Sequence, residues 1–141
     1  LVKLYVQEEG TETMLELAHP DSGNRLVILS LSRIEFRAAV RRRAKLGDLD
    51  TELANELINE FNGHVSTVFQ LQPINEPAMD AAAAAIDSYY LRAYDAMQFG
   101  GYIALRNSVN EAVEIVFVCA DNQLLKAAHD QDFPIVNPAT E

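Results

Sequence analysis

Three acidic residues stand at positions that the polar face of a helix does not explain. Asp121 directly follows an apolar run that ends at Ala120, and Glu35 comes shortly after a second apolar run. Asp95 lies in a segment of helical pattern with few other charges. Two carboxylates about 4 Å apart repel each other by roughly 4 kcal/mol at an effective dielectric constant of 20, so a cluster of them requires protons, solvent or a cation. Oxygen ligands without a neighbouring His or Cys predict Mg²⁺ or Mn²⁺.

Two of these acids also have a structural explanation. Ser32 followed by Glu35 has the spacing of a capping box, and Asp121 precedes a short helical pattern as an N-cap does. Each cap contributes about 1 kcal/mol to helix stability. Taken one by one, the capping explanation is the more common one. A site requires the three carboxylates to come together, and both explanations stay open at this point.

The elements that must position these acids alternate between strand and helix, which predicts an α/β protein. The strand patterns cover residues 25–31, 68–74, 113–120 and 134–136. The helix patterns cover residues 32–47, 48 or 50 to 63, 76–89, 91–106 and 121–128. The two strongest strand patterns are nearly continuous apolar runs, which predict a parallel sheet covered on both faces. The carboxyl ends of such strands are where open α/β sheets bind ligands. No interior linker is visible, so a single domain is expected over residues 1–141.

The composition is that of a folded chain with a strong acidic excess. Of 141 residues, 49% are apolar, and 21 acids outnumber 11 bases to give a formal charge of −10. This charge opposes non-specific attraction to phosphate backbones or anionic lipid, so binding to nucleic acid requires a local basic patch or bound cations. The single cysteine, Cys119, excludes an internal disulfide and is typical of a reducing compartment. No apolar run approaches the ~20 residues that span a bilayer, so we expect a cytoplasmic protein with no membrane partner.

Several other chemistries lack their motifs. The three histidines, His19, His64 and His129, have no pair with the spacing of zinc ligands. The chain contains no G-x-S-x-G nucleophile elbow and no P-loop of the form G-x-x-x-x-G-K-[ST]. Acyl transfer therefore lacks support, and P-loop hydrolysis of nucleoside triphosphates is excluded.

Segments along nearly the whole chain resemble, in order, the successive motifs of the PIN domain. The segments read LVKLY at residues 1–5, SLSRIEFRAA at 30–39, LRAYDAM at 91–97 and FVCADNQLL at 117–125, with a closing IVNP at 135–138. The subgroup that they resemble most is the VapC-type toxins of bacterial and archaeal toxin–antitoxin pairs. Each motif is weak by itself, but their order and spacing make the resemblance fairly specific.

This resemblance implies a metal-dependent endoribonuclease of three-layer α/β/α architecture with a central parallel sheet. In the family, four acids at the carboxyl edge of the sheet hold one or two Mg²⁺ or Mn²⁺ ions, and Glu35, Asp95 and Asp121 match the second, third and fourth. The first acid and most of the first strand are expected just upstream of Leu1. Cleavage would leave a 5′-phosphate and a 3′-hydroxyl. The implied partners are an RNA substrate, a VapB-like antitoxin that covers the acidic cleft, and a second copy of the chain in a homodimer.

Positive charge, which contact with RNA requires, is concentrated in residues 33–45, where six of the eleven bases lie. At 100° per residue, one stripe of bases falls roughly opposite Glu35, which favours a solvated face or an acidic partner. This stripe comprises Arg33, Arg37 and Arg41. Arg42 lies on nearly the same face as Glu35 and is the better candidate for binding RNA. Arg92, one turn before Asp95, is the second candidate, either for a phosphate or for an ion pair.

Two departures from the family pattern bear on activity. Cys119 stands two residues before Asp121, where the family often has Thr or Ser, and a thiol is the weaker hydrogen-bonding partner. Gly100 and Gly101 stand inside a predicted helix, where each costs about 1 kcal/mol relative to Ala. The glycines permit either close backbone packing or a local break. A second hypothesis therefore stays open, in which the chain is a catalytically inert PIN-like module that binds a protein partner.

Overall fold

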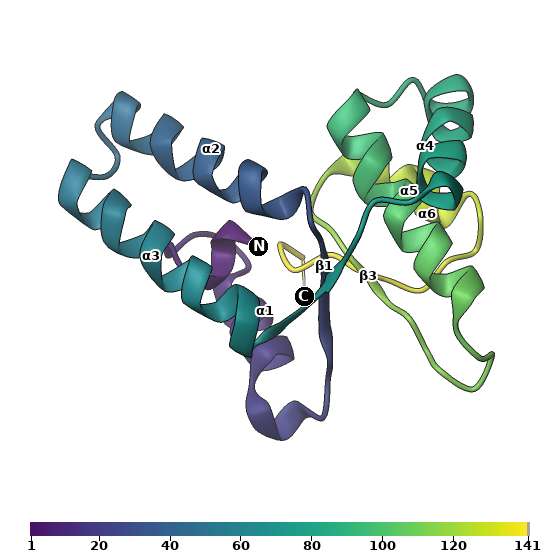
Figure 1. Ribbon diagram of the computed structural model, residues 1–141, viewed down its shortest axis with the longest axis horizontal. Coiled ribbons are helices and arrows are strands. Elements are labelled where there is room, and N and C mark those ends of the chain that lie inside the picture. The colour runs from purple at the N-terminus through teal and green to yellow at the C-terminus, as the bar shows by residue number, and fades with distance from the viewer. Residues whose placement is uncertain (141) are drawn as a thin grey trace. The chain divides into compact units, whose positions relative to one another are not determined.

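The computed structural model describes residues 1–140 and shows a mixed α/β chain (Figure 1). The elements are η1 (Val2–Leu4), α1 (Thr11–Ala18), η2 (Pro20–Ser22), β1 (Leu26–Leu29), α2 (Ser32–Leu46), α3 (Thr51–Thr67), β2 (Phe69–Gln72), α4 (Glu76–Tyr89), α5 (Ala93–Ser108), β3 (Phe117–Val118), α6 (Asn122–His129) and β4 (Ile135–Val136). They form two compact units, Leu1–Gln72 and Pro73–Glu141. The α/β class is therefore confirmed, whereas the single domain stays a prediction.

The first unit is built on one parallel strand pair. Strand β1 pairs with β2, with Leu26 opposite Phe69, and the α2–α3 hairpin forms the crossover between them (Figure 1). Gly47 ends α2 at φ +85°, where a side chain would be strained. Asp50 caps α3, and its Oδ1 accepts a hydrogen bond from Leu53 N at 2.7 Å. Local capping chemistry thus sets the turn between the two helices.

Aromatic rings form the core of the first unit. Phe36 from α2 stacks on Phe61 from α3 with ring centroids 4.2 Å apart, and both side chains are fully buried. Tyr5 packs edge-on against Phe36 at 4.9 Å, and its hydroxyl hydrogen-bonds His64 Nδ1 at 2.8 Å. Helix α3 continues through Gly63 to Thr67, beyond the expected stop at 63, because Val65 packs on this core.

The second unit is built on the α4–α5 helix pair. Helix α4 begins at Glu76 and ends at Tyr89, as predicted, with Asn75 Oδ1 accepting a hydrogen bond from Ala78 N at 3.0 Å. Helix α5 is continuous through Gly100 and Gly101, so the two glycines do not break it. A Cβ built on Gly100 would lie 2.3 Å from the Ala78 carbonyl oxygen and 2.7 Å from Ala82 N. The glycine therefore serves close backbone packing, which decides between the two alternatives.

Strand β3 is shorter than its sequence pattern. Of the expected strand 113–120, only Phe117–Val118 pairs with β4, although Cys119 N also donates to Val136 O at 3.0 Å. The side chains of Ile115, Phe117 and Cys119 pack on the core of the second unit, whereas Val116 and Val118 are exposed. The expectation that both faces of this strand are covered is wrong, because only alternate side chains meet the core.

The central sheet is also not formed in the described part of the chain. Residues 1–140 contain two separate parallel pairs, β1–β2 and β3–β4, and no described strand pairs with both of them. Across the same residues, no helix has the length and apolar character needed to cross a bilayer.

Candidate carboxylate site

Asp121 is held at the carboxyl end of β3 by the start of α6. Its Oδ1 accepts hydrogen bonds from Gln123 N at 2.9 Å and from Leu124 N at 3.0 Å. These bonds confirm the expected N-cap, because they satisfy backbone donors that the first turn of a helix leaves unpaired. The side chain itself remains exposed. The carboxylate is thus both fixed in orientation and open to a ligand.

Asp95 lies in the first turn of α5 and is half-buried. Burial raises the pKa of its carboxyl group, and the negative charge of Asp121 raises that pKa further. The guanidinium of Arg92 acts in the opposite direction and is the smallest of the three causes. The structure therefore brings two of the predicted acids, from α5 and α6, within electrostatic reach of each other. Such a pair favours a bound proton or a bound cation.

Cys119 belongs to the same cluster of side chains. Its Sγ accepts a hydrogen bond from Asp121 N at 3.2 Å, which turns the chain from β3 into the cap of α6. Burial raises the pKa of the thiol, the Asp121 backbone hydrogen bond lowers it, and the charges of Asp121 and Asp95 raise it again. Its position at the end of the strand matches the prediction. The hydrogen bond between Cys119 and Asp121 was not predicted from the sequence. The sequence feature that could have indicated it is a Cys two residues before a capping Asp.

Arg92 is the one predicted RNA contact that lies beside this pair. It is exposed, occupies the N-cap position of α5 without a capping side-chain hydrogen bond, and lowers the pKa of Asp95. Among residues 1–140 it forms no ion pair within 4 Å with an acid (the four such pairs lie elsewhere). The guanidinium is therefore available to an anionic group near the carboxylates.

Glu35 and Arg42 belong to the first unit. Both are on α2, Glu35 half-buried in the first turn and Arg42 exposed nearer the C-terminal end. They are seven residues apart, so they share a face about 10 Å apart along the helix axis. The expected capping box is wrong, because Leu31 already has helical backbone angles and is the N-cap, which makes Ser32 the first helical residue.

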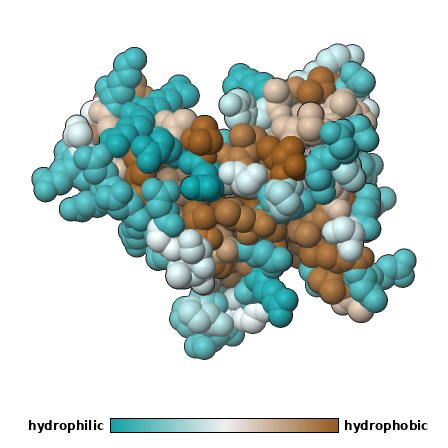
Figure 2. Space-filling model, viewed as in Figure 1, coloured by the Kyte–Doolittle hydropathy of each residue, from teal (hydrophilic) through white to brown (hydrophobic). Residues whose placement is uncertain are grey.

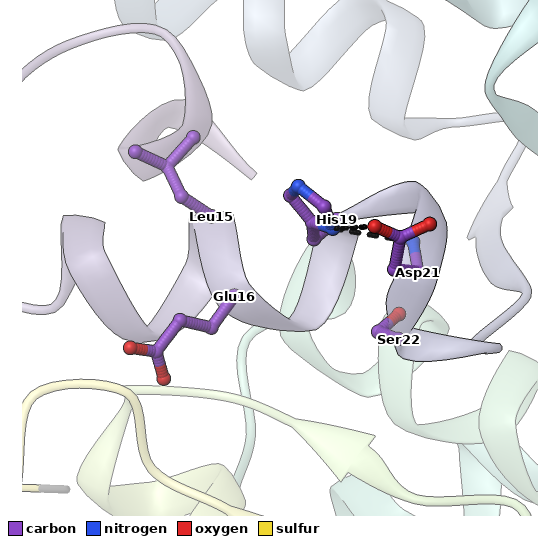
Figure 3. Close-up of a pocket in the computed structure, with 5 residues that line it drawn as sticks. All are labelled: Leu15, Glu16, His19, Asp21 and Ser22. Atoms are coloured by element: carbon purple, nitrogen blue, oxygen red, sulfur yellow. Dashed lines mark hydrogen bonds and ion pairs between the residues drawn. The ribbon is translucent and has the colours of Figure 1, made fainter.

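One hollow in the first unit contains none of the predicted site residues. It measures about 420 Å³ and is lined by Leu15, Glu16, His19, Asp21 and Ser22 (Figure 3). In Figure 3, His19 faces Asp21; Nδ1 of His19 accepts a hydrogen bond from Asp21 N at 3.2 Å and lies 3.7 Å from Asp21 Oδ2. The Ser22 hydroxyl donates to Leu17 O at 3.1 Å rather than to the imidazole. This group therefore does not form a nucleophile–base pair.

A divalent cation fits the donors at the carboxylate pair. Mg²⁺ is commonly held in proteins by one or two carboxylates together with water and substrate phosphates. Asp95 and Asp121 supply such oxygens. The charge of Asp121 raises the pKa of Asp95 by more than the charge of Arg92 lowers it. Across the described residues, no group of three or more His, Cys, Asp and Glu side chains has the arrangement of a metal site. Asp95 and Asp121 are therefore the candidate metal ligands in the second unit.

Comparisons of the chain with protein-family models, with curated proteins and with solved structures found no match. Membership of the PIN family stays a prediction.

Proposed function

We propose that this chain is a metal-dependent endoribonuclease of the PIN type that acts as the toxin of a toxin–antitoxin pair. The observation that carries the proposal is the position of Asp121, which follows the parallel strand β3 with its Oδ1 held by Gln123 N and Leu124 N and its side chain exposed. Asp95, in the first turn of α5, supports it, because the charge of Asp121 raises the pKa of Asp95. Glu35 is retained as a third predicted ligand. A VapB-like antitoxin, a homodimer and a cytoplasmic location belong to the same proposal.

The residues of the second unit have distinct parts in the proposed chemistry. A bound Mg²⁺ or Mn²⁺ would stabilise the charge on the phosphate and lower the pKa of a water molecule. Asp95 and Asp121 would hold the ion, and the capping bonds to Asp121 Oδ1 keep its carboxylate in one orientation. Arg92 supplies a cation next to Asp95 for the RNA phosphate. Cys119 sets the backbone of Asp121 through its thiol.

The test is cleavage of total cellular RNA by the antitoxin-free protein, in Mn²⁺ and in EDTA. Asp95→Asn removes a proposed ligand with little change of shape. Asp87→Asn removes the same charge from an exposed position on α4 and serves as the matched control. We expect discrete metal-dependent fragments from the wild type and from Asp87→Asn, and none from Asp95→Asn, whose circular dichroism spectrum should match that of the wild type. Cleavage that survives in Asp95→Asn would contradict the assignment.

A second candidate function is that of an inert PIN-like module that binds a protein partner. It is favoured by the cap of α6, since the two hydrogen bonds to Asp121 give this carboxylate a structural role that needs no metal. The two functions differ in metal linkage, because a cation that binds only the folded protein raises its melting temperature. A nuclease should show a rise with Mn²⁺ that is absent in Asp95→Asn. An inert module should show no rise in either protein.

A further inference from the structure

The net charge of helix α2 is opposite in sign to that of the whole chain. It carries six bases and one acid, a formal charge of +5, in a protein whose formal charge is −10. In Figure 2 hydrophilic side chains gather over this helix at the upper left. Burial of the apolar face of α2 requires polar residues on its other faces, but it does not require that nearly all of them be cationic. The excess of one sign therefore needs a further explanation.

Some of these bases are already engaged within the first unit. Arg43 forms an ion pair with Glu8 through its Nη2, and Arg41 Nη2 donates to the neutral Asn55 Oδ1 at 2.6 Å. Arg33 and Arg37 are exposed and form no ion pair within 4 Å in the part of the chain that the structure describes. In the first unit as described, neither guanidinium group is thus occupied by an ion pair.

Arg33 and Arg37 line a hollow of about 340 Å³ with Ser30, Ile34 and Asn62. The two arginines are four residues apart on α2, so their side chains lie on the same face of the helix. Ser30 contributes a hydroxyl from the end of β1, and Asn62 contributes an amide from α3. Of the described residues that line this hollow none is acidic, and each of the polar ones is able to donate hydrogen bonds.

We propose that this hollow binds a phosphate group, and that the source of the phosphate is the backbone of an RNA strand. Paired guanidinium groups match the oxygens of a phosphate with charge-assisted hydrogen bonds, and the hydroxyl and amide supply further donors. The apolar Ile34, 60% exposed at the edge of the hollow, offers a surface for the adjoining sugar, which a free anion would not use. The choice of RNA rests on the proposed function; the phosphate site rests on the hollow alone.

The experiment measures binding of a labelled single-stranded RNA by fluorescence anisotropy, in EDTA and with the Asp95→Asn protein, so that no strand is cut. The test variant is Arg33→Gln/Arg37→Gln. The matched control is Arg25→Gln/Lys45→Gln, which removes the same charge from exposed positions outside the hollow. We expect the test variant to bind about tenfold more weakly and the slope of log K against log salt to shrink by roughly 0.7, the value for one phosphate contact on a single strand. The control should change both quantities by much less.

Each other outcome overturns the inference in a defined way. Equal losses in the two double variants would mean that overall charge, and not the hollow, attracts RNA. Displacement of RNA by polyglutamate as effectively as by unlabelled RNA would assign the surface to an acidic protein. A melting shift with inorganic phosphate that depends on Arg33 and Arg37, without RNA binding, would assign the site to a free anion. No binding of either probe would reject the site.

The proposed function is tested separately with a small diester, bis(p-nitrophenyl) phosphate, in Mn²⁺. This substrate is too small to need the hollow. Its hydrolysis should be the same in the wild type and in Arg33→Gln/Arg37→Gln, and should be lost in Asp95→Asn. Failure of the phosphate site would leave this activity intact, whereas failure of the nuclease proposal would abolish it in the wild type.

Discussion

Gly100→Ala is the change whose effect can be worked out most directly from the structure. Alanine in the middle of a helix is favoured over glycine by about 1 kcal/mol, so propensity alone predicts a gain in stability. At this position, however, the new Cβ would lie 2.3 Å from Ala78 O, 2.7 Å from Ala82 N and 2.9 Å from Ala82 Cβ. The two shortest of these contacts are to the backbone of α4, which cannot rotate away as a side chain would.

The clash of the new Cβ with α4 is expected to cost more free energy of unfolding than the higher helix propensity of alanine contributes. Overpacking a tight core costs about 1–3 kcal/mol, and a contact with helix backbone falls at the upper end of that range because α4 and α5 must move apart. After the helix gain of about 1 kcal/mol is subtracted, we expect Gly100→Ala to lower the free energy of unfolding by about 2 kcal/mol. For a chain of this size that corresponds to a fall in melting temperature of roughly 6 °C.

Gly63→Ala is the matched control for this prediction. Gly63 also lies inside a helix, α3, but a Cβ there would meet nothing within 4 Å. The propensity term therefore acts alone, and we expect this variant to be about 1 kcal/mol more stable than the wild type. Both variants are measured by urea unfolding followed by circular dichroism. A Gly100→Ala protein as stable as Gly63→Ala would refute the argument that α4 and α5 meet at Gly100.

Three further predictions concern the carboxylate pair. Asp121→Ala should destabilise the protein by about 1 kcal/mol in thermal unfolding because it removes the cap of α6, while Asp121→Asn, whose amide oxygen still accepts, should cost clearly less. The raised pKa of Asp95 means that the folded state binds the proton of this carboxyl group more tightly than the unfolded state does. The contribution of Asp95 to stability therefore falls as the pH rises from its ordinary pKa of 3.8 through its raised pKa in the folded protein. The melting temperature of Asp95→Asn relative to wild type should therefore be more favourable at pH 7 than at pH 3; the reverse order would count against the raised pKa. Cys119 is the single thiol, so its alkylation by iodoacetamide can be followed directly, and Asp95→Asn should speed that reaction at pH 8 by removing a charge that raises the thiol pKa. Asp87→Asn should leave the alkylation rate unchanged.

The helix boundaries were the most predictable part of the fold. Asn75 before Glu76 and Pro77, and Asp50 before Thr51, satisfy backbone donors within the same few residues, so the start of each helix can be derived from local chemistry. The capping box at Ser32 failed for a reason that lies outside the local pattern. Only the turn residues Ser30 and Leu31 separate strand β1 from the helix, and Leu31 already adopts helical angles, one residue earlier than the motif requires.

The strands were predictable in place but not in extent. All four appear within the expected segments, yet β3 pairs over only Phe117–Val118 of a run of eight expected residues. Apolar, β-branched residues show that a segment is able to form a strand, whereas the number of paired residues depends on the partner strand that lies beside it. The same limit explains why the pattern predicted one central sheet and the described residues form two pairs.

The sequence by itself determined the α/β class and, to within one residue, the ends of α2, α4 and α6, and it offered an N-cap as one of two roles for Asp121, because each depends on chemistry within a few neighbouring residues. Helix α1 was not predicted. Only the tertiary structure decided that Asp95 lies within electrostatic reach of Asp121 and that Arg33 and Arg37 share a hollow with Asn62. It also decided that Gly100 is a packing contact rather than a helix break. These three relations join residues on different helices, and the approach of one helix to another is set by the packing of whole faces, which no local pattern specifies.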